Sequence, residues 1–404
     1  MSRSTPSRSR SASGRRAGDS SSHPTSRSAS TIASAGSSPG WSACERWRPR
    51  GSPMPERRPL GFGRHEEAAA AGATAPPAVP TMDDRAAAAL LPERPARGHK
   101  GTFGKVLAIA GSLDYAGAAL LVCRAAARAG AGLVTLAVPE SLQPLFAAKV
   151  VEATTMALPE DDVEEVDPEP SIARILDHEH DAIVLGPGLR PGLATTELVR
   201  MLLAAPGDDP EPAPMVLDAE ALRSMATLGE WWTGTLRPCV LTPHAGEFER
   251  LRSGAGVEAG SDGDVSGDDD ARRAAATAAA QAWGQVVVLK GAKTVIAEPD
   301  GTVTVAPFEN PGLATGGTGD VLSGVIGGLL AQGLKPGPAA RLGVFLHGTA
   351  GDLVRERLGD AGLLASDLPD AVPLVRKRLA AIAERGKPGK RVGFAVRDGD
   401  GASA

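Results

Sequence analysis

From Lys105 onward, short runs of Val, Ile, Leu and Ala alternate with segments of helical periodicity. The apolar runs are continuous, as in KVLAIAG from Lys105 and DAIVLGPG from Asp181, and such runs are typical of strands buried on both faces of a parallel sheet. Three runs that lie close together, QVVVLKG, TVIAEPDG and TVTVAPF, are expected to be partly antiparallel. The pattern therefore predicts an α/β chain with a mostly parallel central sheet covered by helices.

Composition divides the chain into three parts. Residues 1–81 are rich in Ser, Arg and Pro, and we expect a disordered, low-complexity extension because the segment has too little apolar surface to offset the entropy of ordering. An organelle transit peptide is the alternative for such a basic start, but the prolines and the lack of apolar periodicity argue against it. The folded domain is expected at residues 82–384, with an acidic surface loop at 253–270 and a polar tail at 385–404.

Charge and cysteine content narrow the partners and the compartment. A net charge of -5 over 404 residues supplies no basic field for nucleic acid or a membrane surface, so we expect neither partner. The three cysteines, Cys44, Cys123 and Cys239, form no CxxC pair, which excludes a disulfide framework and fits a reducing compartment. The sequence contains no apolar run of about 18 residues and no secretory signal core. We therefore expect a cytoplasmic protein.

The stretch NPGLATGGTGDVLSG, which begins at Asn310, places five glycines around one acid, Asp320. Such a cluster lets successive backbone N–H groups point at an anion where a helix begins. The expected nest consists of Gly316, Gly317, Thr318 and Gly319. Asp320, on the first turn of the helix, is then suited to act as the base for a hydroxyl that attacks phosphorus. A plain helix-start acid, worth about 0.3–1 kcal/mol, is the less favoured alternative.

Polar residues also follow three other expected strands, and parallel sheets bind ligands beyond the carboxyl ends of their strands. Lys290, with Gly291 behind it, is the favoured phosphate or nucleotide contact, whereas Lys293 is equally explained as a solvated hairpin residue. A structural role is favoured for His244 if its position is taken alone. Asp218 is either a helix cap or a polar site residue, and capping is an adequate explanation.

Two familiar nucleotide motifs are absent. GHKGTFGKV resembles a Walker A loop, but its outer glycines are one residue too far apart, and Val106 stands where Mg²⁺ binding needs Ser or Thr. GPGLRPG fails the dinucleotide fingerprint because Pro191 replaces the third glycine. The sequence therefore predicts neither a P-loop nor a Rossmann NAD site. The HEH at residues 178–180 precedes a strand, at the wrong end of the sheet, so we expect no metal site there and assign no metal ligand.

Several motifs, taken in order, resemble the ADP-dependent (S)-NAD(P)H-hydrate dehydratase family. They are HKGTFGKVLAIAGS, IVLGPGL, VLDAEAL, LTPHAGEF, VVLKGAKTVIAEPDG and NPGLATGGTGDVLSG. The resemblance covers residues 99–379 and implies a ribokinase-like, three-layer α/β/α sandwich. It also implies a hydro-lyase that returns the S epimer of hydrated NADH or NADPH (NADHX or NADPHX) to NAD(P)H, with release of AMP and phosphate. ADP would be the phosphoryl donor, and Mg²⁺ would offset its charge.

The resemblance also assigns roles to residues of this sequence. The implied hydrate-binding positions are Ala118, Gly188, His244 and Asp320, and the implied nucleotide-binding positions are Lys290, Gly291, Ala292, Lys293, Thr294 and Gly319. Asp320 would deprotonate the C6 hydroxyl of the hydrate. The chain departs from the family at Ala245, where proline is usual, and at Arg190, where glycine is common. The implied assembly is a homo-oligomer, a tetramer, with a separate epimerase in the same pathway because residues 1–81 cannot form the epimerase domain of the bifunctional members.

Two other functions stay open at this point. A kinase of the same fold, acting on a vitamin precursor or a sugar hydroxyl, would keep Asp320 and the glycine nest, although GPGL and PHAGE favour the dehydratase. A nucleotide-sensing module without enzymatic activity would keep the nest but would need no base, and Asp320 argues against it.

Overall fold

The computed structural model describes residues 80–206, 212–255, 265 and 267–386. The predictions for residues 1–79, for most of the segment 253–270 and for the tail from residue 387 lie outside the described residues. The Pro80 carbonyl accepts a hydrogen bond from the Val305 N–H, and Met82 is already in the core at 5% exposure. Pro80, two residues before the expected boundary at residue 82, therefore already contacts the folded domain.

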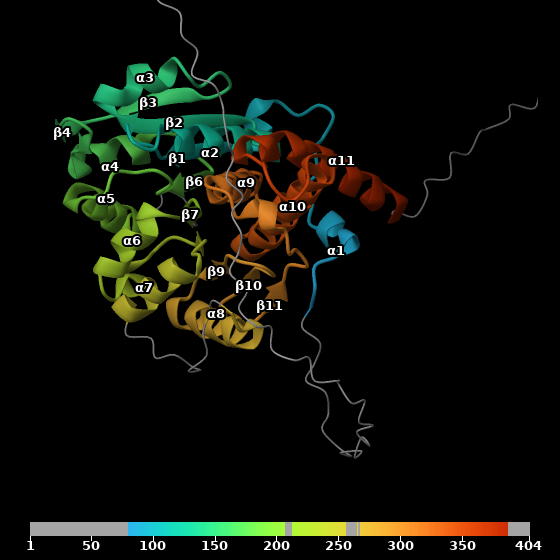
Figure 1. The fold of residues 1–404 in the computed structure, drawn as a ribbon. Helices are drawn as coiled ribbons and strands as arrows, with labels where there is room; N and C mark the ends of the chain where they lie inside the picture. The colour runs from blue at the N-terminus through green and yellow to red at the C-terminus, as the bar shows by residue number, and fades with distance from the viewer. Residues whose placement is uncertain (1–79, 207–211, 256–264, 266, 387–404) are drawn as a thin grey trace, which may run out of the picture. The chain divides into compact units, whose positions relative to one another are not determined.

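Nine strands of the described chain form one sheet in the order β11-β10-β9-β8-β7-β6-β1-β2-β3 (Figure 1). They are β1 (Lys105–Ile109), β2 (Leu133–Pro139), β3 (Thr154–Leu158), β6 (Ala182–Leu185), β7 (Met215–Leu217), β8 (Cys239–Leu241), β9 (Val286–Leu289), β10 (Val295–Ala297) and β11 (Val303–Val305). Neighbouring strands from β3 across to β9 are parallel, whereas β10 is antiparallel to β9 and β11. The predicted sheet is confirmed, including its partly antiparallel end. A separate two-stranded ribbon consists of β4 (Glu160–Asp162) and β5 (Glu165–Val166).

The central strands are buried on both faces, because successive side chains of a strand point to opposite sides of the sheet. In β1, Val106 and Ala108 belong to one hydrophobic core, and Leu107 and Ile109 belong to the other. The apolar runs are continuous in the sequence because each face of the sheet needs its own apolar cover.

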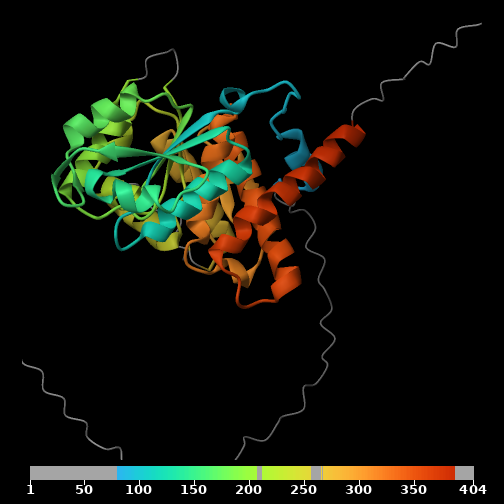
Figure 2. The same ribbon diagram turned by 90° about the horizontal axis from the view of Figure 1, so that it is seen from above.

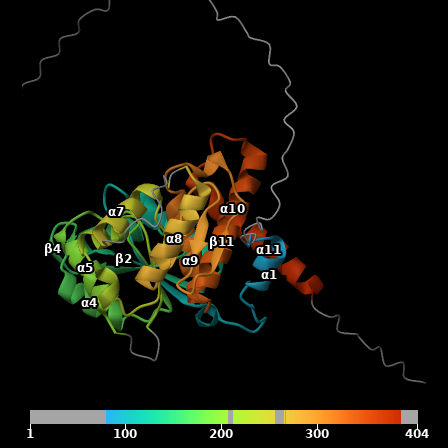
Figure 3. The same ribbon diagram turned by 90° about the horizontal axis from the view of Figure 1, so that it is seen from below.

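Two layers of helices cover the sheet (Figures 2 and 3). One core includes side chains of α1 (Asp84–Ala89), α2 (Ala116–Ala129), α3 (Gln143–Ala147), α9 (Thr318–Ala331), α10 (Pro336–Leu358) and α11 (Leu368–Gly386). The other includes side chains of α4 (Pro168–Asp177), α5 (Leu193–Ala204), α6 (Glu220–Thr227), α7 (Ala245–Ala255) and α8 (Asp269–Trp283). Short 3₁₀ turns occur at Lys100–Phe103, Glu140–Leu142, Trp231–Gly234, Pro311–Leu313 and Ala365–Asp367. In the part of the chain that is described, no helix is both long and apolar enough to cross a membrane.

Strand order reverses between β1 and β6, since β2 and β3 follow on one side and β7, β8 and β9 on the other. Such a reversal opens a crevice at the carboxyl ends of the two strands, and ligands of open α/β sheets bind there. The fold therefore predicts a ligand site among the residues that follow β1, β6 and the strands beside them.

Glycines let α9 approach its neighbours more closely than any other residue would. A Cβ at Gly324 would lie 2.5 Å from the Val122 carbonyl oxygen of α2, and one at Gly327 would lie 2.3 Å from Val184 Cγ2 of β6. On the α10 side, a Cβ at Gly343 would lie 2.6 Å from Ile326 Cγ1. Helix α9 is thus held against the sheet and two helices, and in Figure 2 the orange helices lie beside the teal strands.

This packing predicts a stability difference between two glycines. A Cβ at Gly328 of α9 would lie 2.6 Å from the Ala126 carbonyl oxygen, whereas a Cβ at Gly117 of α2 would meet nothing within 4 Å. Gly328→Ala should lower the free energy of unfolding by about 1–3 kcal/mol because backbone must move. Gly117→Ala should leave it unchanged or raise it by up to about 1 kcal/mol. Denaturant titration measures both, and equal values for the two variants would contradict the close approach of α9 and α2.

Candidate active site

The predicted polar residues gather where three neighbouring strands end. Asp218 follows β7, His244 follows β8 and Lys290 follows β9. His244 and Lys290 form an isolated parallel bridge, and the Lys290 N–H donates to the Pro243 carbonyl at 2.8 Å. Helix α9 contacts β1, β6 and β7, and its first turn carries Asp320. Asp320 thus belongs to the same end of the sheet as these three residues.

A largely buried lysine joins these strand ends. The Lys290 ammonium donates to Asp218 Oδ1 at 2.8 Å and lies 3.7 Å from Glu247 Oε2. Both carboxylates are enclosed, with residue exposures of 1% for Asp218 and 8% for Glu247. Burial alone would lower the pKa of Lys290, but the attraction of the Asp218 and Glu247 carboxylates outweighs it and raises that pKa. Lys290 is therefore a cation throughout the physiological range.

Of the two roles that the sequence left open for Asp218, helix cap and polar site residue, the structure shows the second. The cap of α6 is Ala219, and no side chain caps that helix. Instead, Asp218 Oδ1 accepts from Lys290 and from the Ala219 N–H, while Oδ2 accepts from Ser323 Oγ at 2.6 Å. Burial would raise the pKa of Asp218, but the Lys290 charge and these hydrogen bonds lower it. Asp218 is a polar site residue because a cation from another strand lies against it.

Asp320 lies in the first turn of α9, as the sequence predicts. Burial raises its pKa to about 7, and the Asp218 and Glu247 carboxylates act in the same direction against Lys290. A carboxyl group that titrates near neutrality holds a proton well enough to act as a general base at physiological pH.

The glycines before Asp320 form the start of the helix. Gly317 caps α9 with a φ of 91°, a left-handed conformation that glycine adopts without strain. The Thr318 hydroxyl points inward, 2.8 Å from the Leu313 carbonyl oxygen and 2.9 Å from that of Thr315. The N–H groups of Gly319 and Asp320 have no acceptor among the described residues, because the first turn of a helix leaves its donors unpaired. They are available to an anion.

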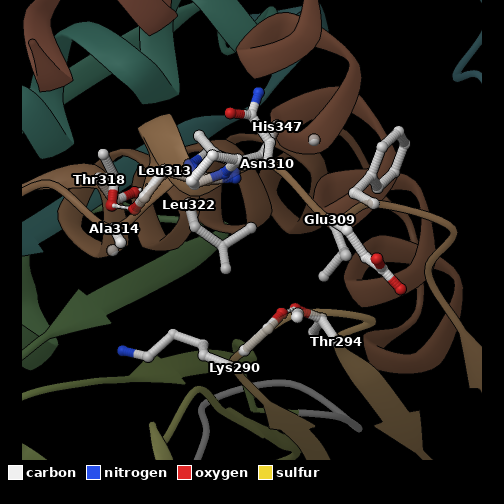
Figure 4. A pocket seen from close by; sticks show the side chains of 16 residues that line it. Lys290, Thr294, Glu309, Asn310, Leu313, Ala314, Thr318, Leu322 and His347 are labelled. Carbon is white, nitrogen blue, oxygen red and sulfur yellow. Dashed lines mark hydrogen bonds between the residues drawn. The ribbon is translucent and has the colours of Figure 1, made fainter. Parts of the chain in front are cut away.

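A cavity of about 440 Å³ opens beside this turn. Figure 4 shows Lys290 and Thr294 on one side of it and Leu313, Leu322, Asn310 and His347 on the other. Its other lining residues are Gly291, Ala292, Phe308, Glu309, Pro311, Ala314, Thr318, Gly319, Val344 and Gly348. The cavity is within the size range of small-molecule sites, and its lining is largely apolar with few polar groups, as such sites usually are.

Five of the six predicted nucleotide positions line this cavity: Lys290, Gly291, Ala292, Thr294 and Gly319. Lys293 does not. Its ammonium pairs with Asp269 at 3.1 Å and with Glu309 at 3.0 Å, and both carboxylates raise its pKa. Its side chain is accounted for by surface ion pairs, which is the solvated role that the sequence left open.

Two of the four predicted hydrate-binding residues, Ala118 and Gly188, lie at the reversal of the strand order, whereas His244 follows β8 and Asp320 lies on α9. Gly188 follows β6, and a Cβ there would lie 2.8 Å from Ala118 Cβ on α2, so these two positions are in direct contact. His244 is half exposed, and its Nδ1 accepts hydrogen bonds from the N–H groups of Gly246 and Glu247. The His244 N–H donates to Glu247 Oε2 at 2.9 Å. These bonds fix the ring although alanine follows it.

Two residues that support the site were missed from the sequence. Buried His347 on α10 lies 2.9 Å from the Thr318 carbonyl oxygen through Nε2. Burial lowers its pKa to about 4, so the neutral ring carries its proton on Nε2 and donates to that carbonyl. Buried Arg272 donates to the Leu289 carbonyl, and a Cβ at Gly291 would lie 2.5 Å from its Nη1. The sequence offers one signal for His347, a ring within the apolar stretch LGVFLHG of α10, and none for Arg272, which stands beside Arg273 in the charged first turn of α8.

Solved structures share this architecture. A ribokinase-like protein from Enterococcus faecalis superposes with a TM-score of 0.60 at 25% identity, over 76% of this chain and 99% of that one. A crystal structure of the ADP/ATP-dependent NAD(P)H-hydrate dehydratase from Bacillus subtilis, co-crystallised with ATP and Mg²⁺, superposes with a TM-score of 0.62 at 33% identity, over 75% of this chain and 100% of that one. The chain has the ribokinase-like α/β/α fold, as predicted.

The family follows from the sequence comparisons. A family model described as NAD(P)H-hydrate dehydratase matches residues 106–374. The ADP-dependent (S)-NAD(P)H-hydrate dehydratase of Xanthomonas campestris is 37% identical over 289 residues, which are 70% of this chain and 91% of that protein. The chain belongs to the NAD(P)H-hydrate dehydratase family.

Longer relatives match as well. A bifunctional NAD(P)H-hydrate repair enzyme from Moorella thermoacetica is 44% identical over 292 residues, which are 72% of this chain but 52% of that protein. The chain thus spans about half the length of the bifunctional relatives it matches.

Proposed function

We propose that this protein is an ADP-dependent hydro-lyase that dehydrates the S epimer of NADHX or NADPHX to NAD(P)H, with release of AMP and phosphate. The observation that carries the proposal is Asp320, a carboxyl group with a pKa of about 7 in the helix turn whose Gly319 and Asp320 N–H groups are unpaired and whose Gly319 lines the cavity. Family membership supplies the substrate class.

ADP would occupy the 440 Å³ cavity. Leu313, Leu322 and Val344 offer apolar surface to the adenine ring, and the diphosphate would extend toward the N–H groups of Gly319 and Asp320 at the helix start. The Lys290 ammonium, directed at the same turn, adds a positive charge. Lys293 would not contact the nucleotide, since its side chain pairs with Asp269 and Glu309.

The hydrate would lie on the other side of Asp320, at the reversal of the strand order. Gly188 and Ala118 are small enough there for the nicotinamide nucleotide to approach the backbone, and the exposed ring of His244 is available for a polar contact. Asp320 would then lie between the two substrates, as phosphoryl transfer between them requires.

In the reaction, the Asp320 carboxylate takes the proton of the C6 hydroxyl, and that oxygen attacks the terminal phosphorus of ADP. The bond from this phosphorus to the bridging oxygen breaks, and AMP leaves. The lone pair of the ring nitrogen N1 then expels phosphate from C6, and loss of the C5 proton restores the 5,6 double bond. The N–H groups at the start of α9 stabilise the charge of the phosphoryl group during transfer.

Mg²⁺ is part of the proposal, since the Bacillus subtilis relative was co-crystallised with ATP and Mg²⁺. The described residues contain no group of three or more His, Cys, Asp or Glu side chains that could hold a metal. They fit an ion whose ligands come mostly from the diphosphate and water, which is how Mg²⁺ often binds with nucleotides. When bound, the ion would offset the charge of the diphosphate.

We also propose a cytoplasmic homo-oligomer, a tetramer by family resemblance, with a separate epimerase supplying the S epimer.

The direct test of function is incubation of the protein with NADHX and ADP while absorbance at the NADH band is followed. Recovery of that band that depends on ADP supports the dehydratase. Without recovery, ADP-dependent phosphorylation of a vitamin precursor or a sugar would favour the kinase alternative.

The nucleotide site predicts the effect of a larger residue at position 319. A Cβ at Gly319 would lie 3.4 Å from Lys290 Nζ, so the branches of a valine would fill the gap that the diphosphate needs. Gly319→Val should weaken ADP binding by about tenfold or more, equivalent to about 1.4 kcal/mol. Titration calorimetry measures this, with Gly117→Val as the control, because nothing lies within 4 Å of a Cβ at Gly117. Unchanged ADP affinity in Gly319→Val would remove the assignment.

The proposed base predicts a selective loss of turnover. Asp320→Asn keeps the shape of the side chain but cannot accept the proton. Its turnover of NADHX should fall by about a hundredfold or more, while calorimetry should still detect ADP binding. Asp300→Asn, at the exposed tip of the β10–β11 hairpin, should turn over normally. If Asp320→Asn were equally active, Asp320 would be a helix-start acid and the mechanism would be wrong.

The pKa of about 7 for Asp320 predicts two opposite effects of pH. Turnover should fall as pH falls through 7, because only the ionised carboxylate takes a proton. The folded-state pKa is raised, so the stability that Asp320 contributes is present below its unfolded pKa and is lost as pH rises through 7. The melting temperature of Asp320→Asn relative to wild type should therefore rise between about pH 5 and about pH 8. A constant difference in melting temperature would contradict the raised pKa.

A further inference from the structure

Asp218 is the most enclosed carboxylate of the site, with an exposure of 1%. It follows β7, between β6 and β8 in the sheet, and it is not among the described residues that line the cavity. A charge so deep in the protein destabilises the fold unless it is paired and hydrogen-bonded. Its partners therefore show what it does.

Both oxygens of Asp218 have partners. Oδ1 accepts from the Lys290 ammonium at 2.8 Å and from the Ala219 N–H at 2.9 Å, while Oδ2 accepts from Ser323 Oγ at 2.6 Å. Lys290 comes from the end of β9, and Ser323 comes from α9. Asp218 therefore joins two residues, Lys290 and Ser323, that are more than 30 positions apart in the sequence.

Each partner leads to a different part of the site. Ser323 is fully buried, at 0% exposure, and it comes three residues after Asp320, so the two side chains lie on one face of α9. Lys290 faces the start of the same helix, since a Cβ at Gly319 would lie 3.4 Å from its Nζ. One contact of Asp218 fixes the helix that carries the base, and the other fixes the cation at the nest.

We propose that Asp218 is a positioning residue of the reaction, which holds Lys290 and Ser323 together and thereby fixes the ammonium at the nest relative to Asp320. It acts through these two residues and not through contact with substrate. The inference rests on the proposed function, because it deepens the account of that same site.

The charges around Asp320 set its pKa, so a change in that pKa can distinguish a positioning role of Asp218 from a purely structural one. Asp218 after β7, Glu247 on α7 and Lys290 after β9 all act on Asp320, the two acids against its ionisation and the lysine in favour of it. His347 on α10 is neutral, since burial lowers its pKa to about 4. Removing the Asp218 charge leaves Lys290 to act on Asp320 with less opposition, so the pKa of Asp320 should fall.

The first experiment uses three variants of the full chain, with NADHX and ADP as substrates. Asp218→Asn should lower kcat by about tenfold or more, because the ammonium and the base lose their alignment, and should move the acid limb of the kcat–pH profile to lower pH. Ser323→Ala removes the contact to α9 but keeps every charge, so kcat should fall while the limb stays in place. Asp370→Asn, at a half-exposed carboxylate paired with Arg124 and Arg128, should change neither.

Two results of that experiment overturn the proposal. One is an Asp218→Asn profile that superimposes on that of wild type, with kcat within about twofold. The other is a fall in kcat that matches the loss of folded protein while the acid limb stays in place, because that is the outcome of a purely structural role.

The second experiment does not use the reaction. In thermal unfolding, Asp218→Asn and Lys290→Met should each lower the melting temperature, since each leaves a buried group without its partner. The double variant should lower it by less than the sum of the two, because the residues are coupled. Failure of the wild type to convert NADHX would overturn the proposed function, and the coupling would still support the link between Asp218 and Lys290. Additive changes would overturn that link whether or not the enzyme turns over.

Discussion

The close approach of α9 to its neighbours is the constraint on which the site depends. Gly324 and Gly327 bring the helix axis so near to α2 and to β6 that a single added Cβ would overlap the Val122 carbonyl or the Val184 side chain. Because protein interiors are close-packed, a helix held this way has one position along its axis. The first turn of α9 therefore has a fixed position relative to the carboxyl ends of the strands. The unpaired N–H groups and Asp320, which belong to that turn, are fixed in the same way relative to the cavity.

The site combines one buried cation with three carboxylates. Lys290 is paired closely with Asp218 and less closely with Glu247. These two ion pairs offset the free-energy cost of burying the lysine and both of its carboxylate partners. Within the described part of the chain Asp320 forms no ion pair, and burial raises its pKa to about 7. Under the proposed function, the same arrangement would supply a permanent positive charge near the phosphate and a base that titrates in the physiological range, as proton abstraction beside phosphoryl transfer requires.

Much of this was predictable from the sequence, and the rest was not for physical reasons. Continuous apolar runs predicted the parallel sheet. Because ligands bind at the carboxyl ends of such strands, the sequence alone also predicted that Lys290, His244 and Asp320 belong to one site. The partners of Asp218 were not predictable, because Lys290 and Ser323 reach it only through the strand order and the depth of α9. The sequence left Lys293 open between a nucleotide contact and a solvated hairpin residue, because it shows neither the φ of 50° that the turn gives Lys293 nor the pairing of its ammonium with Asp269 and Glu309. His347 stands in the apolar stretch LGVFLHG of α10, and only the fold reveals the carbonyl to which it donates.

The antiparallel β10–β11 hairpin offers a place where residues can be inserted into this chain. Thr294 before β10 and Phe308 after β11 both line the cavity, so the open end of the hairpin sets the cavity width. Residues 298–302 connect the strands at the opposite end, where Pro299 and Asp300 are exposed. Exposed loop tips tolerate insertion far better than packed segments, and the Phe308 ring is seated against Gly348 of α10. Extra residues, an affinity tag or a reporter domain therefore have a natural place at this tip, where the chain can lengthen while the ring and the width of the cavity stay unchanged.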